Sequence, residues 1–416
     1  MSKQNKIQIN NTLLYINIFI FVISLGEGII IPIIPLYADQ LGASYSQLGF
    51  LITGYSLGFA GLTLLSGRLS DNIGRKKIIL IGIVINLIAA LGYMLAATVE
   101  QVLMARILEG MSRGMIWPLT TAIIADNTQL GNRNRTMGIF TACYGGGIAL
   151  GTVIGGIIAQ KLSYNTVFPA YVVLSMIVFV IVWFNIHEDA GKSHLIEQTP
   201  LKKELNKINL KSELKGIMPL AFIGFSFAGL LWTIAALQSK IADTAGFSPV
   251  IIGAFFSALW GSRIVAALNM GRVVDKWGRK KVLTVSLIFC LLATLIYPFS
   301  QHVVSLLFAS VLVGLGTGII YPLIVSLAAD KVSARNRGVA MGFLETAMGF
   351  GMILQPAFSG LAGQYIGLYS TYLVGMTFIV FSIMVTVIII NEDYIKGYNS
   401  TISLNEGEIS ELQGGK

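Results

Sequence analysis

The sequence predicts an all-α membrane protein with twelve transmembrane helices in two six-helix bundles, which are related by a parallel internal repeat. Three observations support this fold class. The 416-residue chain is 55% hydrophobic and only 12% charged, about half the charged fraction of a typical soluble domain. Lysines and arginines are concentrated in alternate connections between apolar segments. A basic motif flanked by glycines occurs twice, 204 residues apart.

The apolar segments are long enough to cross a bilayer. A transmembrane helix needs about 20 predominantly apolar residues. Segments of this kind lie near residues 13–36, 47–66, 78–97, 101–125, 136–159, 166–186, 217–238, 249–270, 282–299, 303–328, 340–363 and 368–390. The first is too long for a removable signal peptide and lacks the small-residue cleavage site, so it is interpreted as the first span.

These spans predict four parts of the chain. Residues 1–186 form the N-terminal six-helix bundle and residues 217–390 the C-terminal one. The polar stretch 187–216 is the linker between them, and residues 391–416 form a tail. We expect a multi-pass protein of the cell membrane.

The basic residues predict the orientation of the chain. All but five of the 29 lysines and arginines lie in the two tails, the linker and alternate connections. Cytoplasmic loops hold the excess of basic residues in membrane proteins, so both termini are expected to be cytoplasmic. The net charge of +9 therefore indicates topology, and no nucleic-acid partner is expected.

An internal duplication relates the two bundles. The stretch GRLSDNIGRKK at residues 67–77 recurs as GRVVDKWGRKK at residues 271–281. The same offset, without a gap, relates Gly110, Pro118, Asp126, Gly147 and Gly156 to Gly314, Pro322, Asp330, Gly351 and Gly360. Because each copy has an even number of spans, both copies have the same orientation in the membrane.

Over nearly its whole length the chain resembles a transporter of the major facilitator superfamily. Residues 67–77 resemble its motif A between helices 2 and 3. Residues 106–114, RILEGMSRG, resemble the helix 4 motif, although Glu109 replaces the usual glutamine. Residues 147–156, GIALGTVIGG, are similar to the helix 5 motif of the drug–proton antiporters, with Thr152 in place of their proline.

The resemblance implies that the repeated motif forms two latches of an inner gate. The latch residues would be Gly67, Asp71, Gly74, Arg75 and Asp126, with Gly271, Asp275, Gly278, Arg279 and Asp330 as counterparts. Glycine permits tight reversals and close helix approach, the aspartate can accept hydrogen bonds, and the basic cluster anchors the loop. The alternative is that both loops serve only as topology anchors.

Ionisable residues inside the spans indicate a functional site. At the bilayer centre such a group costs at least about 2.5 to 3.5 kcal/mol, so it usually faces a polar interior. Arg106, Glu109 and Arg113 share one face of a helix, and Glu109 stands in the favourable i, i+4 position before Arg113. Glu27 is expected at a similar depth and could neutralise their net positive charge.

By resemblance, helices 1, 4, 7 and 10 line a central cavity. Glu27, Glu109, Arg106 and Arg113 are therefore proton-coupling or substrate-binding candidates, and a static buried ion network is the alternative. Two secondary buried charges, Arg263 and Glu345, could pair with each other or be structural.

Aromatic residues are the remaining candidates for substrate contact. They are Trp117, Trp232 and Tyr321 on cavity helices, together with Tyr144 on helix 5. They suit an apolar or cationic substrate, whereas most intramembrane aromatics serve packing. The three histidines show no spacing typical of a metal site or a catalytic triad, so no metal, no cofactor and no enzyme activity are expected.

The favoured hypothesis is proton-coupled export, by antiport, of a small hydrophobic or amphipathic compound through alternating access. One alternative is a proton-coupled symporter that imports a sugar or an organic anion. The other is a substrate-sensing membrane receptor. The expected partners are the small-molecule substrate, protons and the lipid bilayer, and the chain is expected to act as a monomer.

The predicted orientation can be tested by cysteine labelling. In a background without Cys143 and Cys290, a cysteine at Ser46 should react with an impermeant maleimide on intact cells, whereas one at Ser193 should not. The physical reason is that the basic linker stays on the cytoplasmic side. Labelling of position 193 but not of position 46 would invert the topology.

Overall fold

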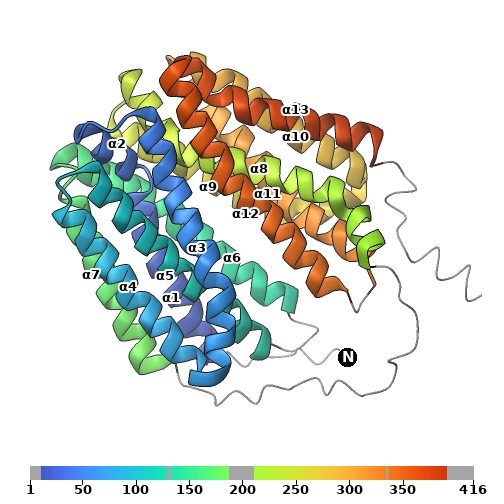
Figure 1. The fold of residues 1–416 in the computed structure, drawn as a ribbon, viewed down its shortest axis with the longest axis horizontal. Coiled ribbons are helices and arrows are strands. Elements are labelled where there is room, and N and C mark those ends of the chain that lie inside the picture. The colour runs from blue at the N-terminus through green and yellow to red at the C-terminus, as the bar shows by residue number, and fades with distance from the viewer. Residues whose placement is uncertain (1–10, 129–132, 187–209, 334–335, 391–416) are drawn as a thin grey trace, which may run out of the picture.

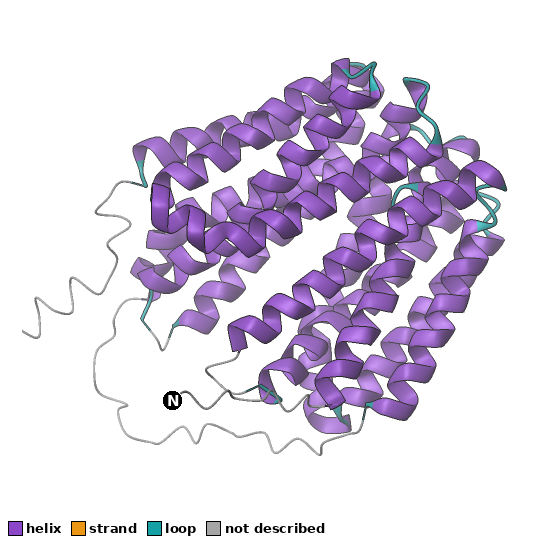
Figure 2. Cartoon of the chain, turned by 180° about the vertical axis from the view of Figure 1, so that it is seen from behind, coloured by secondary structure: helices purple, strands orange, loops and turns teal. Residues whose placement is uncertain are grey.

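The structure is a computed structural model that describes residues 11–128, 133–186, 210–333 and 336–390. In these ranges the regular elements are all helices, and no strand is present (Figure 2). The N-terminal half contains α1 (Asn11–Ile30), α2 (Ile33–Gln40), α3 (Tyr45–Ile73), α4 (Arg75–Leu95), α5 (Val99–Asp126), α6 (Arg133–Lys161) and α7 (Val167–Asn185). The C-terminal half contains α8 (Leu210–Thr244), α9 (Pro249–Trp277), α10 (Arg279–Ile296), α11 (Val303–Lys331), α12 (Arg337–Tyr365) and α13 (Leu373–Ile388), with short 3-10 helices η2 (Tyr297–Phe299) and η3 (Leu368–Tyr372). The predicted all-α membrane fold is confirmed.

Eleven helical segments of the described chain are long and apolar enough to cross a membrane. The first, Thr12–Gln40, covers α1 from its second residue onward and all of α2. The remaining predicted span is α5, whose hydropathy is lowered by Arg106, Glu109 and Arg113. Its 28 residues extend for about 42 Å at 1.5 Å per residue, which is enough to cross a bilayer.

The repeated basic motif folds mostly as helix rather than as a loop. α3 continues to Ile73 and α4 begins at Arg75, so the chain reverses at Gly74 alone. Gly74 has a φ of 94° and its repeat counterpart Gly278 has a φ of 82°, a left-handed conformation that glycine adopts without strain. The predicted turn is therefore shorter than the motif, because Gly67 and Gly271 lie inside α3 and α9.

The two halves touch on one side of the molecule and separate toward the other (Figure 1). We call the side on which α7 ends and α8 begins the linker side. On the opposite side α3 packs against α12, and α6 packs against α9. The backbone of Gly49 closely approaches Pro356, and that of Gly156 approaches Pro249. Nearer the linker side, Gly342 of α12 has open space where a side chain would begin, as far as the described residues show.

Polar contacts between the halves reinforce the closed side. Lys240 of α8 donates to Asp39 of α2 at 2.5 Å. The hydroxyl of Thr53 in α3 donates to the carbonyl oxygen of Ile353 in α12 at 2.9 Å. The conformation is therefore closed opposite the linker by both helix packing and an ion pair.

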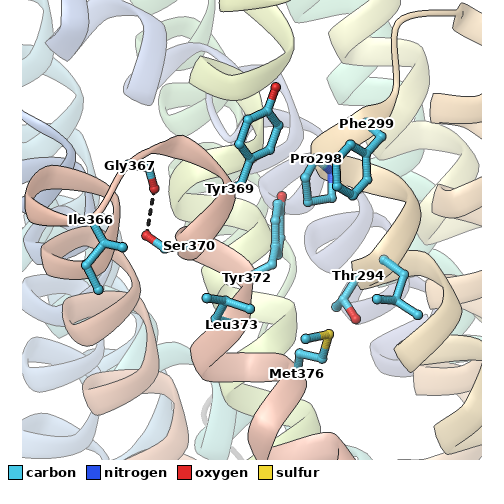
Figure 3. A pocket seen from close by; sticks show the side chains of 11 residues that line it. Thr294, Pro298, Phe299, Ile366, Gly367, Tyr369, Ser370, Tyr372, Leu373 and Met376 are labelled. Atoms are coloured by element: carbon cyan, nitrogen blue, oxygen red, sulfur yellow. Dashed lines mark hydrogen bonds between the residues drawn. The ribbon is translucent and has the colours of Figure 1, made fainter.

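A separate apolar pocket of about 390 Å³ lies within the C-terminal half, near the closed side (Figure 3). Its walls come from α10, η2, η3 and α13 and include Phe299, Tyr369, Tyr372 and Met376. Because these elements all belong to one half, a rocking motion of the two halves would not by itself open or close this pocket. It is therefore distinct from the space between the halves.

The closed side should depend on glycine at the crossing of α12 and α3. A Cβ atom at Gly360 would lie 2.5 Å from the carbonyl oxygen of Tyr45, so Gly360→Val should favour separation of the halves there. A cysteine replacing Ser56, which is 2% exposed, should then react several-fold faster with a maleimide in the purified protein that lacks the native cysteines. Gly342→Val, on the same helix, is the matched control and should leave the rate unchanged. Equal rates in the two variants would contradict this account of the closed side.

Candidate functional site

An ion pair between Glu27 and Arg113 lies at the centre of the N-terminal half. Glu27 is on α1 and Arg113 on α5, and both side chains are 5% exposed. The hydroxyl of Tyr55 on α3 donates to Glu27 at 3.4 Å. The Arg113 guanidinium carbon lies 5.7 Å from the ring centroid of Tyr144 on α6. The pair therefore joins α1 to α5 and contacts an aromatic side chain of α6.

A second buried ion pair lies one to two turns away on α5. Arg106 donates to Glu109 at 2.7 Å, and the hydroxyl of Tyr93 on α4 donates to the same carboxylate at 2.5 Å. The guanidinium carbon of Arg106 also lies 4.7 Å from the ring centroid of Tyr55. Both charged side chains are at most 3% exposed.

The favourable i, i+4 arrangement of Glu109 and Arg113 does not produce an ion pair. Glu109 accepts hydrogen bonds from Arg106 and Tyr93, whereas Arg113 forms its ion pair with Glu27 of another helix. The four groups thus form two pairs with no net charge. The sequence predicted that Glu27 lies at the depth of the charged residues of α5 and could neutralise them. It did not predict that the four groups divide into two separate ion pairs.

An aromatic pocket lies between the halves beside the Glu27–Arg113 pair. Its walls include Glu27, Tyr144, Trp232 and Trp260, from α1, α6, α8 and α9. Apolar residues of the same helices, such as Leu231, Phe256 and Leu259, complete it. Its volume is about 20 Å³ in this conformation, which is room for roughly one water molecule. In this conformation the pocket therefore has no room for a small organic molecule.

Two ring contacts between the halves involve aromatic residues of this pocket. Tyr144 meets Trp260 edge-on with ring centroids 5.8 Å apart, which joins the two halves. Trp232 packs against Tyr55 at 5.2 Å, a second contact between the halves. Both ring pairs therefore join the N-terminal half to the C-terminal half.

The predicted aromatic candidates therefore divide into two groups. Tyr144 and Trp232 line the aromatic pocket. Trp117 lies behind it against Tyr144, with ring centroids 4.9 Å apart. Tyr321 is 39% exposed, and its hydroxyl donates to Glu345 at 2.9 Å.

Arg263 and Glu345 do not pair with each other. The guanidinium carbon of Arg263 lies 5.2 Å from the ring centroid of Trp260, and no carboxylate of the described residues lies within 4 Å of this arginine. Glu345 instead accepts the hydrogen bond from Tyr321. The possible pairing of these two residues is therefore not realised in this conformation.

Sequence reasoning missed Trp260, Tyr55 and Tyr93. Trp260 stands three residues before Arg263, a spacing that places both on one helix face and could have identified it. Tyr55 and Tyr93 are single aromatic residues in apolar spans, and no sequence signal separates them from packing residues. Their role depends on contacts with charged groups from other helices.

Each of the two predicted latches contains an ion pair between neighbouring helices of the same half. Arg75 of α4 pairs with Asp126 of α5, and Arg279 of α10 pairs with Asp330 of α11 at 2.5 Å. Asp275 forms no ion pair with any described residue, and the side chain of Asp71 lies outside the described part. The observed pairs thus join adjacent helices and do not cross between the halves.

The same backbone contacts also recur in both latches. Lys76 donates to the carbonyl oxygen of Trp183 at 2.7 Å, and Lys280 donates to that of Val387 at 2.8 Å. Each lysine thereby connects the start of one helix to the end of the last helix in its half. The duplication seen in the sequence is therefore repeated in the contacts at the linker side.

Comparisons with known proteins agree with this architecture. The family model described as Major Facilitator Superfamily matches residues 16–261 and 217–403. The chain is 26% identical to the quinolone resistance protein NorA of Staphylococcus aureus (strain COL), over 83% of this chain and 88% of the relative. It is 28% identical to multidrug resistance protein 2 of Bacillus subtilis (strain 168), over 82% of this chain and 86% of the relative.

Two solved structures show the same fold. The nucleoside transporter NupG is similar with a TM-score of 0.71 and 17% identity, over 91% of this chain and 98% of its own. A bacterial homologue of the human lysosomal transporter Spinster, solved in an inward-facing and unoccupied conformation, has a TM-score of 0.67 and 17% identity, over 91% of this chain and 94% of its own.

The Arg106–Glu109 pair should be essential for stability. Glu109→Gln leaves the buried guanidinium without its carboxylate, which should cost about 3 to 5 kcal/mol in the free energy of unfolding. Tyr93→Phe removes one hydrogen bond to a charged group and should cost about 1.5 to 3 kcal/mol. Denaturation of the purified full chain in detergent measures both. A Glu109→Gln variant as stable as wild type would show that Arg106 finds another partner.

Proposed function

The chain belongs to the Major Facilitator Superfamily, and on that premise we propose that it is a secondary transporter that exports small hydrophobic or amphipathic compounds in exchange for protons. The observation that carries this proposal is the Glu27–Arg113 ion pair, which stands at the wall of an aromatic pocket between the two halves. Similarity to proteins named for quinolone and multidrug resistance supports the direction of transport and the substrate class.

The proposed orientation of the protein in the membrane follows from the distribution of its basic residues. If the linker side is cytoplasmic, the conformation is open inward and closed outward. The outer closure then consists of the crossings of α3 with α12 and of α6 with α9, together with the Asp39–Lys240 pair. Rocking of the two halves about the aromatic pocket would break these contacts and expose the pocket to the outside.

Glu27 is the proposed proton-coupling group. In this conformation its carboxyl group pairs with Arg113, and Tyr55 also donates to it. A substrate that separates Tyr144 from Trp260 would disturb Arg113, because that guanidinium lies over the Tyr144 ring. Once the pair is weakened and the pocket faces outward, Glu27 can accept a proton from the outside as the substrate leaves. Return to the inward conformation and renewed pairing with Arg113 would release the proton inside.

The latches are the proposed inner gate of the outward-open state. Arg75–Asp126 and Arg279–Asp330 already fix the helix ends within each half. A Cβ atom at Gly67 or at Gly271 would meet open space, within the described part of the chain. We therefore expect these helix surfaces to receive the opposite half when the linker side closes, with Asp71 and Asp275 taking part in the closed contact.

One chain should suffice for transport. The aromatic pocket takes residues from both halves of the same chain, so a monomer in the lipid bilayer forms the complete proposed site. The proposed mechanism uses only ionisable side chains, the substrate and protons. It requires no cofactor, no metal and no enzymatic step.

The coupling role of Glu27 can be tested in everted membrane vesicles with an acid interior, using amphipathic dyes selected from a panel. Glu27→Gln should abolish dye accumulation driven by the proton gradient, because the side chain can no longer take up and release a proton. Dye binding should remain, since glutamine preserves the shape of the side chain. Glu27→Asp should retain part of the accumulation.

Glu345→Gln is the matched control. It removes another intramembrane carboxylate, which is hydrogen-bonded to Tyr321 but forms no ion pair among the described residues. We expect it to keep most of the accumulation. Undiminished accumulation by Glu27→Gln would remove Glu27 from the mechanism, and accumulation only in the opposite direction would favour import.

A further inference from the structure

Arg263 differs from the other two arginines of the spans in having no carboxylate partner. Arg106 and Arg113 pair with Glu109 and Glu27, whereas Arg263 has no carboxylate within 4 Å in the described residues. Its Nη1 atom is buried and lacks a hydrogen-bond acceptor among those residues. A guanidinium cannot shed its charge as a buried lysine can, so this group remains a cation in need of an anion.

Arg263 stands at the edge of the aromatic pocket. Its guanidinium carbon lies 5.2 Å from the ring centroid of Trp260, which lines that pocket. Trp260 meets Tyr144 edge-on, and Tyr144 in turn lies 5.7 Å from the guanidinium carbon of Arg113. The two rings thus stand between two guanidiniums, one from each half, and only Arg113 is neutralised.

The packing of α9 fixes the position of Arg263. A Cβ atom at Gly318 of α11 would lie 3.0 Å from the Cα atom of Arg263, so the two helices are in close contact at this level. One residue further along α9, the side chain of Ile264 contacts Gly145 of α6 in the other half. Toward the linker side, Gly138 of α6 has no neighbour within 4 Å of a Cβ position in the described chain. Arg263 therefore lies where the contact between the halves ends and the space between them begins.

We propose that Arg263, with Trp260 and Tyr144, forms a binding subsite for the anionic group of an aromatic substrate, with a carboxylate as the preferred anion. This inference rests on the proposed function, because it takes the space between the halves as the substrate path. The planar guanidinium can bind a carboxylate through two parallel hydrogen bonds, and the adjoining rings can stack on an aromatic system. An anion arriving from the linker side meets Arg263 without having to displace a carboxylate, whereas Arg113 would first have to give up Glu27.

The subsite extends the expected substrate class. Aromatic side chains alone favour apolar or cationic compounds. An uncompensated arginine beside them adds affinity for aromatic acids and reduces affinity for aromatic cations, because a like charge at this position is repelled. The protein should therefore distinguish an aromatic acid from a neutral compound of the same shape.

Two probes of nearly equal size test this distinction: 2-naphthoate and 2-naphthamide. Binding is measured by isothermal titration calorimetry on the full chain in lipid nanodiscs at pH 7, without a proton gradient. The wild type should bind 2-naphthoate about tenfold or more tightly than 2-naphthamide, in line with a hydrogen-bonded ion pair in a partly desolvated site. Arg263→Gln should lose most of this preference while its affinity for 2-naphthamide stays the same.

Two further variants complete the test. Arg272→Gln removes an exposed arginine from the same helix and should leave the preference intact. Arg263→Lys keeps the charge but loses the planar fork, so it should retain only part of the preference. If Arg263→Gln does not fold, the preference measured for Arg263→Lys still tests the role of the guanidinium.

Three results would overturn the subsite. The first is equal binding of the two probes by the wild type, and the second is an unchanged preference in Arg263→Gln. The third is an equal loss of affinity for both probes in that variant, which would assign Arg263 a packing role. Because no gradient is present, these results are independent of proton coupling. Failure of the Glu27→Gln transport test would leave the naphthoate preference unaffected.

Discussion

Charge neutrality inside the membrane-spanning core constrains the N-terminal half more than any other single requirement. α5 carries two arginines and one glutamate within eight residues, a combination that is costly in a bilayer unless each charge meets its opposite. The missing carboxylate comes from Glu27, so α1 must pass beside α5 at the correct depth and rotation. Tyr93 and Tyr55 then supply hydrogen bonds from α4 and α3. The two ion pairs and the two tyrosine hydrogen bonds thereby hold four helices in register.

Close backbone approach is the complementary constraint. Gly110 and Gly114 of α5 face backbone atoms of α3, and Gly147, Gly151 and Gly155 of α6 face those of α1. Any side chain at these positions would push the helices apart and separate the charges. The high glycine content thus serves the ion pairs as well as the packing, because helices in lipid associate through contact rather than through the hydrophobic effect.

The two copies share the contacts at their helix ends but differ in the charged residues at their centres. The latch contacts of Arg75 and Arg279 are equivalent in both halves. The central charges are not, since the repeat positions of Glu27 and Arg113 are Leu231 and Thr317. Leu231 still lines the aromatic pocket, opposite the half that carries the acid. A buried ion pair in the N-terminal half and an arginine without a carboxylate partner among the described residues of the C-terminal half give the central pocket two chemically different walls.

The sequence by itself determined the membrane class, the number and approximate limits of the spans, the duplication, and most charged residues of the candidate site. These follow from hydropathy, periodicity and charge, which are properties of short stretches. Only the tertiary structure decided that Glu109 pairs with Arg106 while Arg113 pairs with Glu27, that Trp260 shares a pocket with Tyr144, and that Arg263 and Glu345 stay apart. The physical reason is that a partner on another helix is selected by depth, rotation and crossing geometry. The spacing of residues along one helix contains no information about these relations.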